Sequence, residues 1–74
     1  MSQITLKNRL RVLRAEHRMS QAELALRTGV SRQTILSIES GTTVPSTLLA
    51  FKIAKALGVP VTDIFTMEGE LLPV

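Results

Sequence analysis

The sequence contains no cysteine, no tryptophan and no tyrosine, and His17 is its single histidine. Disulfide bonds are therefore excluded, and one histidine without any cysteine is too few ligands for a structural zinc site. A chain of 74 residues has only a small core, so helix packing, with or without a partner subunit, must stabilise it. We expect no bound metal and no cofactor.

Long apolar runs are lacking as well, both at the N-terminus, where a signal peptide would carry one, and elsewhere. We therefore expect a cytoplasmic protein that makes no contact with a membrane. Catalytic patterns are equally scarce, because no nucleophile has a nearby base, the acidic residues are scattered and no glycine-rich phosphate loop is present. The sequence thus predicts neither an enzyme nor a bound small molecule.

The charge is unevenly distributed along the chain. Residues 1–34 hold seven basic and two acidic side chains, whereas residues 35–74 hold two basic and four acidic ones. A basic half indicates a polyanionic partner such as nucleic acid. Arginine and lysine also suit any exposed helix, so charge alone leaves both interpretations open.

The run 20–35 has the pattern of two short helices joined by a tight turn. Ser20 and Glu23 form a capping box, which predicts a helix over 21–28. Gly29 follows, and glycine readily adopts the positive φ that a sharp helix exit requires.

The second helix of this pair is expected over 31–40. Ser31 is its cap, and Ile35 and Ile38, three residues apart, give it one buried face. Two helices joined in this way form the unit that places a helix in the major groove of DNA.

Apolar spacing and cap residues predict three further helices, at Leu6–His17, Thr47–Leu57 and Asp63–Thr66. The second of them is apolar over much of its surface and is expected at the centre of the core. The fold class is therefore all-α, a compact five-helix bundle. Residues 1–66 are expected to form the helix-turn-helix domain, and residues 67–74 a tail that is disordered or mediates dimerisation.

Six motifs in order resemble the Xre/Cro/C1-type helix-turn-helix regulators of bacteria, archaea and phages: Asn8-Arg9-Leu10-Arg11, Ser20-Gln21-Ala22-Glu23-Leu24-Ala25, Gly29-Val30-Ser31-Arg32-Gln33-Thr34-Ile35, Ile38-Glu39-Ser40-Gly41, Ile53-Ala54-Lys55-Ala56-Leu57-Gly58-Val59 and Asp63-Ile64-Phe65. The resemblance implies a lambda-repressor-like fold and a homodimer that binds double-stranded operator DNA. It also implies a cytoplasmic, nucleoid-associated protein from a prokaryote or a phage. The sequence departs from the family pattern at Ser40, where family members often have asparagine, and at Thr43, where they often have an aromatic residue.

The exposed positions of the helix over 31–40 are the candidates for reading bases. Gln33 can pair with adenine through its amide, and Arg32 can contact guanine or a phosphate. Ser37 lies one turn beyond Gln33 and can add a base or phosphate contact. Leu36 can touch a thymine methyl group, although it fits the edge of the core equally well.

Phosphate binding is expected mainly from Gln21, which begins its helix close to backbone N–H groups that can bind an anion. The other candidates share a hydroxyl or guanidinium group near the expected DNA face: Ser31, Thr34, Arg11, Thr42 and Thr43. An acidic residue at Glu39 would be repelled by phosphates, and the resemblance implies that Arg14 pairs with it inside the domain.

The dimer surface is expected near the C-terminus, because this segment has more apolar residues than so small a core needs: Ile64, Phe65, Leu71 and Leu72. We thus expect a sequence-specific transcriptional repressor that reads a two-fold operator as a dimer. The alternative is an antitoxin or adaptor that uses the same fold to bind another protein.

Overall fold

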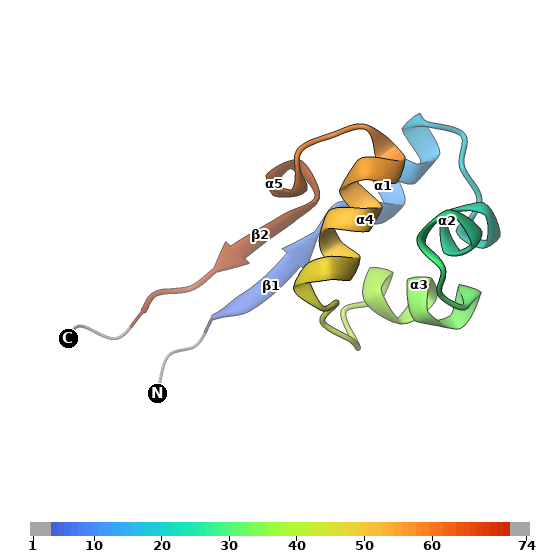
Figure 1. Cartoon of the computed structure of the whole chain (residues 1–74). Helices are drawn as coiled ribbons and strands as arrows, with labels where there is room; N and C mark the ends of the chain where they lie inside the picture. Colours follow the sequence, from blue (N-terminus) through green and yellow to red (C-terminus); the bar gives the residue numbers. More distant parts are fainter. Residues whose placement is uncertain (1–3, 72–74) are drawn as a thin grey trace.

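A computed structural model describes residues 4–71 and shows a small helical body with a two-stranded ribbon extending from it (Figure 1). The helices are α1 (Leu10–Glu16), α2 (Gln21–Thr28), α3 (Arg32–Glu39), α4 (Thr47–Leu57) and α5 (Val61–Ile64). The strands are β1 (Thr5–Asn8) and β2 (Phe65–Glu68). The all-α fold with five helices is confirmed, and the ribbon is a minor addition to it.

Each helix contributes to one apolar core, whose buried members are Leu10, Leu13, Met19, Leu24, Ala25, Ile35, Ile38, Ile53, Ala54, Leu57 and Ile64. Helix α2 packs against both α3 and α4. Ile53 is fully buried, while Leu48 and Phe51 of the same helix are exposed. Helix α4 is therefore buried on one side only, although its sequence predicts a more enclosed position.

Serine caps begin three of the helices. The Oγ atoms of Ser20, Ser31 and Ser46 accept hydrogen bonds from the backbone N–H groups of Glu23, Thr34 and Leu49, respectively. Such caps satisfy donors that the helix itself leaves unpaired. The helices α2, α3 and α4 therefore begin within one residue of their predicted starts.

The first helix is shorter than predicted. It begins at Leu10 rather than Leu6, and residues 5–8 form β1 instead. Asn8 lies at this change of conformation, and its Oδ1 accepts a hydrogen bond from the N–H of Leu10 at 3.1 Å. Its Nδ2 also donates to the carbonyl of Ile38 at 3.0 Å, which ties the start of α1 to α3.

The last helix is displaced as well. Helix α5 covers Val61–Ile64, and Phe65, expected within a helix over 63–66, is extended and begins β2. Strand β2 pairs antiparallel with β1, with Asn8 opposite Phe65. It also runs across the expected boundary between residues 66 and 67, so part of the predicted tail is strand.

The turn after α1 contains a strained residue, Arg18, whose φ is +51°. The N–H of Arg18 donates to the carbonyl of Ala15, and the N–H of Met19 donates to that of Arg14. This hydrogen-bond pattern terminates a helix most readily with glycine in the left-handed position.

We expect Arg18→Gly to raise the free energy of unfolding by about 0.5–1 kcal/mol, because glycine adopts this φ without strain. Urea denaturation at neutral pH measures the change. Ala15→Gly, within α1, is the matched control and should lower stability by about 0.5–1 kcal/mol. A loss of stability in both variants would contradict the strain at Arg18.

Candidate nucleic-acid interface

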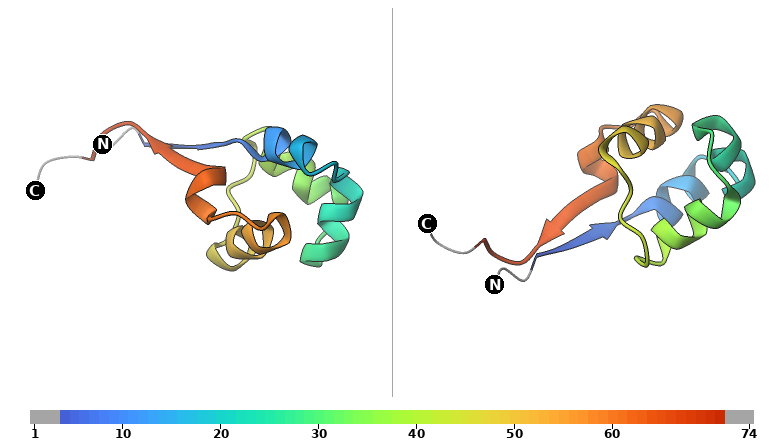
Figure 2. Two further views of the ribbon diagram at one scale, coloured as in Figure 1. Left: turned by 90° about the horizontal axis from the view of Figure 1, so that it is seen from above. Right: turned by 60° about the horizontal axis from the view of Figure 1, so that its bottom comes forward.

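The helices α2 and α3 are joined by a turn and packed against each other (Figure 2). Gly29 ends α2 with φ +73°, and the N–H of Val30 donates to the carbonyl of Ala25. On α3, Ile35 and Ile38 are 0% and 1% exposed. These two anchors hold α3 to the core and leave its opposite side in solvent.

The exposed side of α3 carries the predicted base-reading residues. Arg32 and Gln33 are exposed, Leu36 is 42% exposed, and Ser37 is half-buried. The Nε2 of Gln33 lies 3.4 Å from the Oγ of Ser37, one helical turn away. These four side chains therefore lie on one side of the same helix, and Leu36 is not a core residue.

Several predicted phosphate ligands make hydrogen bonds within the protein. The hydroxyl groups of Ser31 and Thr34 lie 2.9 Å apart, and Ser31 also caps α3. Beyond α3, the Thr42 hydroxyl lies 2.9 Å from that of Ser40. Thr43 is exposed, and its N–H donates to the carbonyl of Ser37. The loop is thus closed against the end of α3.

A buried carboxylate lies between α1, α2 and α3. The side chain of Glu39 is 1% exposed, and its Oε2 lies 2.6 Å from the Nε of Arg14. The Nε2 of Gln21 donates to Oε1 at 3.0 Å, and the Nε of Arg11 lies 3.8 Å from the same oxygen. Arg14 also donates to the carbonyl of Met19 at 2.9 Å. Glu39 thus connects two predicted phosphate ligands to α3, the helix predicted to read bases.

The pKa of Glu39 is lower than that of an ordinary glutamate. Burial alone would raise this pKa, but hydrogen bonds from Arg14 and Gln21, together with the positive charges of Arg14 and Arg11, lower it further than burial raises it. The ionised form is therefore the one that the folded protein stabilises.

We expect this carboxylate to make stability depend on pH in the acid range. A lowered pKa in the folded state contributes stability above the unfolded value of about 4.3, and the contribution is lost as the pH falls through the folded value. Urea denaturation at pH 6 and pH 3 measures the loss. Glu39→Gln removes the titrating group, so the free energy of unfolding of this variant should fall less between pH 6 and pH 3 than that of the parent protein. An equal loss in both proteins would contradict a lowered pKa at this position.

Asn8 also belongs to this region, and its role was not predicted from the sequence. Its two hydrogen bonds join β1, α1 and the end of α3. An asparagine two residues before a helical pattern is a local signal for the bond to Leu10. The bond to Ile38 spans 30 residues, and no local pattern indicates it.

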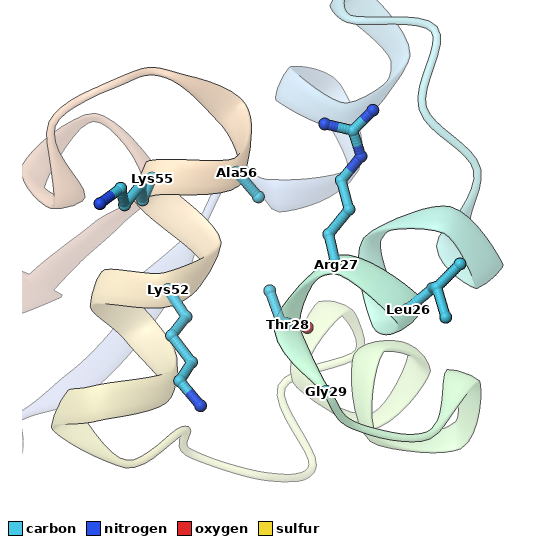
Figure 3. A pocket seen from close by; sticks show the side chains of 7 residues that line it. All are labelled: Leu26, Arg27, Thr28, Gly29, Lys52, Lys55 and Ala56. Atoms are coloured by element: carbon cyan, nitrogen blue, oxygen red, sulfur yellow. The ribbon is translucent and has the colours of Figure 1, made fainter.

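An open hollow of about 480 Å³ lies between the end of α2 and α4 (Figure 3). Arg27, Lys52 and Lys55 are its basic lining residues. Arg27 is already paired with Glu23 at 2.7 Å, and Lys55 points away from the hollow in Figure 3. Lys52 is therefore the main charge that faces the hollow without a partner among the described residues. One such charge does not define a binding site, so we assign no ligand to the hollow.

Neither a metal site nor a membrane-spanning segment is found within residues 4–71. No group of three or more histidine, aspartate or glutamate side chains is arranged to hold a metal ion there. None of the helices in this range is both long and apolar enough to cross a bilayer.

The predicted dimer residues are not all on the surface. Ile64 is 1% exposed and belongs to the core, so its assignment to a dimer surface is wrong. Phe65 is half-buried against that core, and Leu71 is 74% exposed. Leu72 lies outside the described residues.

The sequence model of the helix-turn-helix family matches residues 10–64. The chain belongs to this family. Its resemblance to the Xre/Cro/C1-type regulators is thereby confirmed. The chain is 52% identical over 65 residues to the uncharacterized HTH-type transcriptional regulator MJ0272 of Methanocaldococcus jannaschii, covering 88% of this chain and 98% of the relative.

A second relative is the uncharacterized HTH-type transcriptional regulator YgzD of Bacillus subtilis, 46% identical over 65 residues, with the same coverage of 88% and 98%. Among solved structures, the restriction-modification controller protein C.AhdI of Aeromonas hydrophila superposes with a TM-score of 0.71 and 33% identity. That match covers 74% of this chain and 83% of C.AhdI. The similarity therefore includes sequence, length and fold.

Proposed function

We propose that this protein is a DNA-binding transcriptional repressor that reads a two-fold operator as a dimer, with α3 in the major groove. The observation that carries the proposal is the exposed side of α3, on which Arg32, Gln33, Leu36 and Ser37 lie opposite two buried isoleucines. Membership of the helix-turn-helix family and relatives named as transcriptional regulators support it. The protein would act in the cytoplasm, where its DNA is.

Each side chain on this face has a matching group on the edge of a base pair. The amide of Gln33 can both donate to and accept from adenine, and the guanidinium of Arg32 can donate twice to guanine. The methyl groups of Leu36 can contact the methyl group of thymine. Together they would give α3 a sequence preference over a few adjacent base pairs.

Phosphate binding would come from the start of α2 and from α1. The amide of Gln21 uses one donor on Glu39 and retains a second N–H. The first backbone N–H groups of α2 have no partner within the helix and favour an anion. Arg11, with a side chain 76% exposed, adds a positive charge.

The burial of Glu39 removes an obstacle to binding. A carboxylate on the exposed side of α3 would be repelled by the phosphates of DNA. Its side chain is 1% exposed and paired with Arg14. The acidic residue of α3 is thus turned away from the face that would meet DNA.

Selection of bound duplexes from random DNA at moderate salt tests this function. We expect a two-fold consensus whose half-site centres are about 34 Å apart or a multiple of that distance. Enrichment of no sequence over bulk DNA would contradict the proposal and favour a protein-binding module. A reporter whose promoter overlaps the selected site should lose expression when the protein is present, whereas a gain would indicate an activator.

A further inference from the structure

The ribbon formed by β1 and β2 extends beyond the helical body, which gives the molecule principal dimensions of 42 × 21 × 19 Å (Figures 1 and 2). It contains two strands of four residues each. An isolated two-stranded ribbon is only marginally stable in water, and it needs either further strands with an apolar face or packing against a helix for stability. Phe65 packs against the core, whereas Thr66, Met67 and Glu68 are exposed, so the outer part of β2 lacks such support.

The two faces of the ribbon differ in polarity. Leu6 lies opposite Met67 and Asn8 opposite Phe65, so these four side chains share one face. The other face carries Lys7 and Glu68, whose charged groups lie 3.5 Å apart. On the first face Met67 is 71% exposed. A large apolar side chain thus lies in solvent beside a leucine.

The outer edge of β2 is also unpaired in the part of the chain that the structure describes, where the sheet has two strands only. The N–H of Arg9 donates to the carbonyl of Ile64 at 2.8 Å, in register with the ribbon. Hydrogen-bonded pairs alternate along antiparallel strands, so Lys7 and Thr66 form the next one. The backbone groups of Met67 therefore point away from β1, toward the free edge.

We propose that β2 pairs antiparallel with β2 of a second copy of this chain, about a two-fold axis through Met67, to form a four-stranded sheet. Met67 of each copy then lies opposite Met67 of the other. Their outward N–H and C=O groups bond to each other, and their side chains pack together. The antiparallel pairing places the two helical bodies at opposite ends of this sheet, related by the two-fold axis.

The charges of β2 select this register. An axis through Met67 places Thr66 opposite Glu68 of the second copy and Phe65 opposite Gly69, so no like charges lie directly opposite each other. An axis through Glu68 would oppose two carboxylates, which is destabilising. An axis through Thr66 would place Ile64, a residue of α5, in the strand pairing. The edge is thus complementary to itself, as a two-fold interface requires.

Charge substitutions at Met67 test the register as well as the surface. Met67→Lys alone, and Met67→Glu alone, each place like charges opposite each other at the axis. We expect either variant to raise the dimer Kd by about tenfold or more, as measured by sedimentation or light scattering. An equimolar mixture of the two variants should recover the dimer, because the opposed charges are then of opposite sign.

Leu26→Lys is the matched control, because Leu26 is 83% exposed on α2 and is not part of the ribbon. It should leave the dimer intact, and circular dichroism should show all variants folded. A monomeric parent protein would overturn the inference. So would dimers that persist in both Met67 variants, which would place the interface elsewhere, such as at Val44, Leu48 and Phe51.

The inference rests on the proposed function for its choice of a second copy, and the two can fail separately. If the parent protein selects a two-fold site while both Met67 variants keep the parent dimer Kd, the function stands and the ribbon interface is wrong. If the mixture recovers the dimer while no DNA sequence is selected, the interface stands and the DNA-binding function is wrong.

Discussion

Arg14→Met is expected to lower the free energy of unfolding by about 3 kcal/mol. The substitution leaves the carboxylate of Glu39 buried at 1% exposure without its main partner. Gln21 and Arg11 would still contact the carboxylate, which is why we expect the lower end of the range for broken buried pairs. Urea denaturation at pH 7 measures the change.

The double variant Arg14→Met, Glu39→Met provides the control for this prediction. It removes both charges and replaces them with flexible apolar side chains, so most of the stability should return. A residual loss of about 1 kcal/mol is expected, because the carbonyl of Met19 loses the bond from Arg14. A double variant as unstable as the single one would show that the unpaired charge is not the cause.

Gln33→Ala is expected to reduce discrimination at one base pair of each half-site by about 1–3 kcal/mol. The amide is exposed on α3 and lies 3.4 Å from Ser37, so its loss leaves the fold intact. Competition binding to the selected operator and to its single-base variants at fixed salt measures the change. Affinity for unrelated DNA should stay the same.

Gln21→Ala is the matched comparison, because it removes the same side-chain amide from α2. It should weaken binding to every sequence alike, since phosphate contacts carry no direct sequence information. Its effect on stability must be measured in parallel, because Gln21 also donates to Glu39. If both variants lost specific and general affinity in the same proportion, the assignment of bases to Gln33 and phosphates to Gln21 would be wrong.

The helices of the DNA-binding unit could be predicted because their determinants are local. Ser20 and Ser31 each bond a backbone N–H three residues ahead, and Gly29 takes its positive φ at the end of α2. The spacing of Ile35 and Ile38 likewise identifies the buried side of α3. Such signals lie within one or two helical turns, so the sequence alone reveals them.

The strands could not be predicted in this way. Leu6 continues the helical spacing of Leu10 and Leu13, so the apolar pattern alone extends the helix over β1. The conformation of this segment depends on pairing with β2, which lies at the other end of the chain. The misassignment of Ile64 to a dimer surface has a related cause, since an apolar sequence does not indicate which core it fills.

The buried side of α3 anchors the helix, and its exposed side carries the proposed base contacts. This separation determines how the DNA specificity of the protein could be changed. Ile35 and Ile38 fix the helix to the core, and Glu39 ties its end to α1. Arg32 and Gln33 are exposed. Changes at these two positions should therefore be tolerated in many combinations, so a library that varies them on this scaffold could retarget the protein without redesigning the fold.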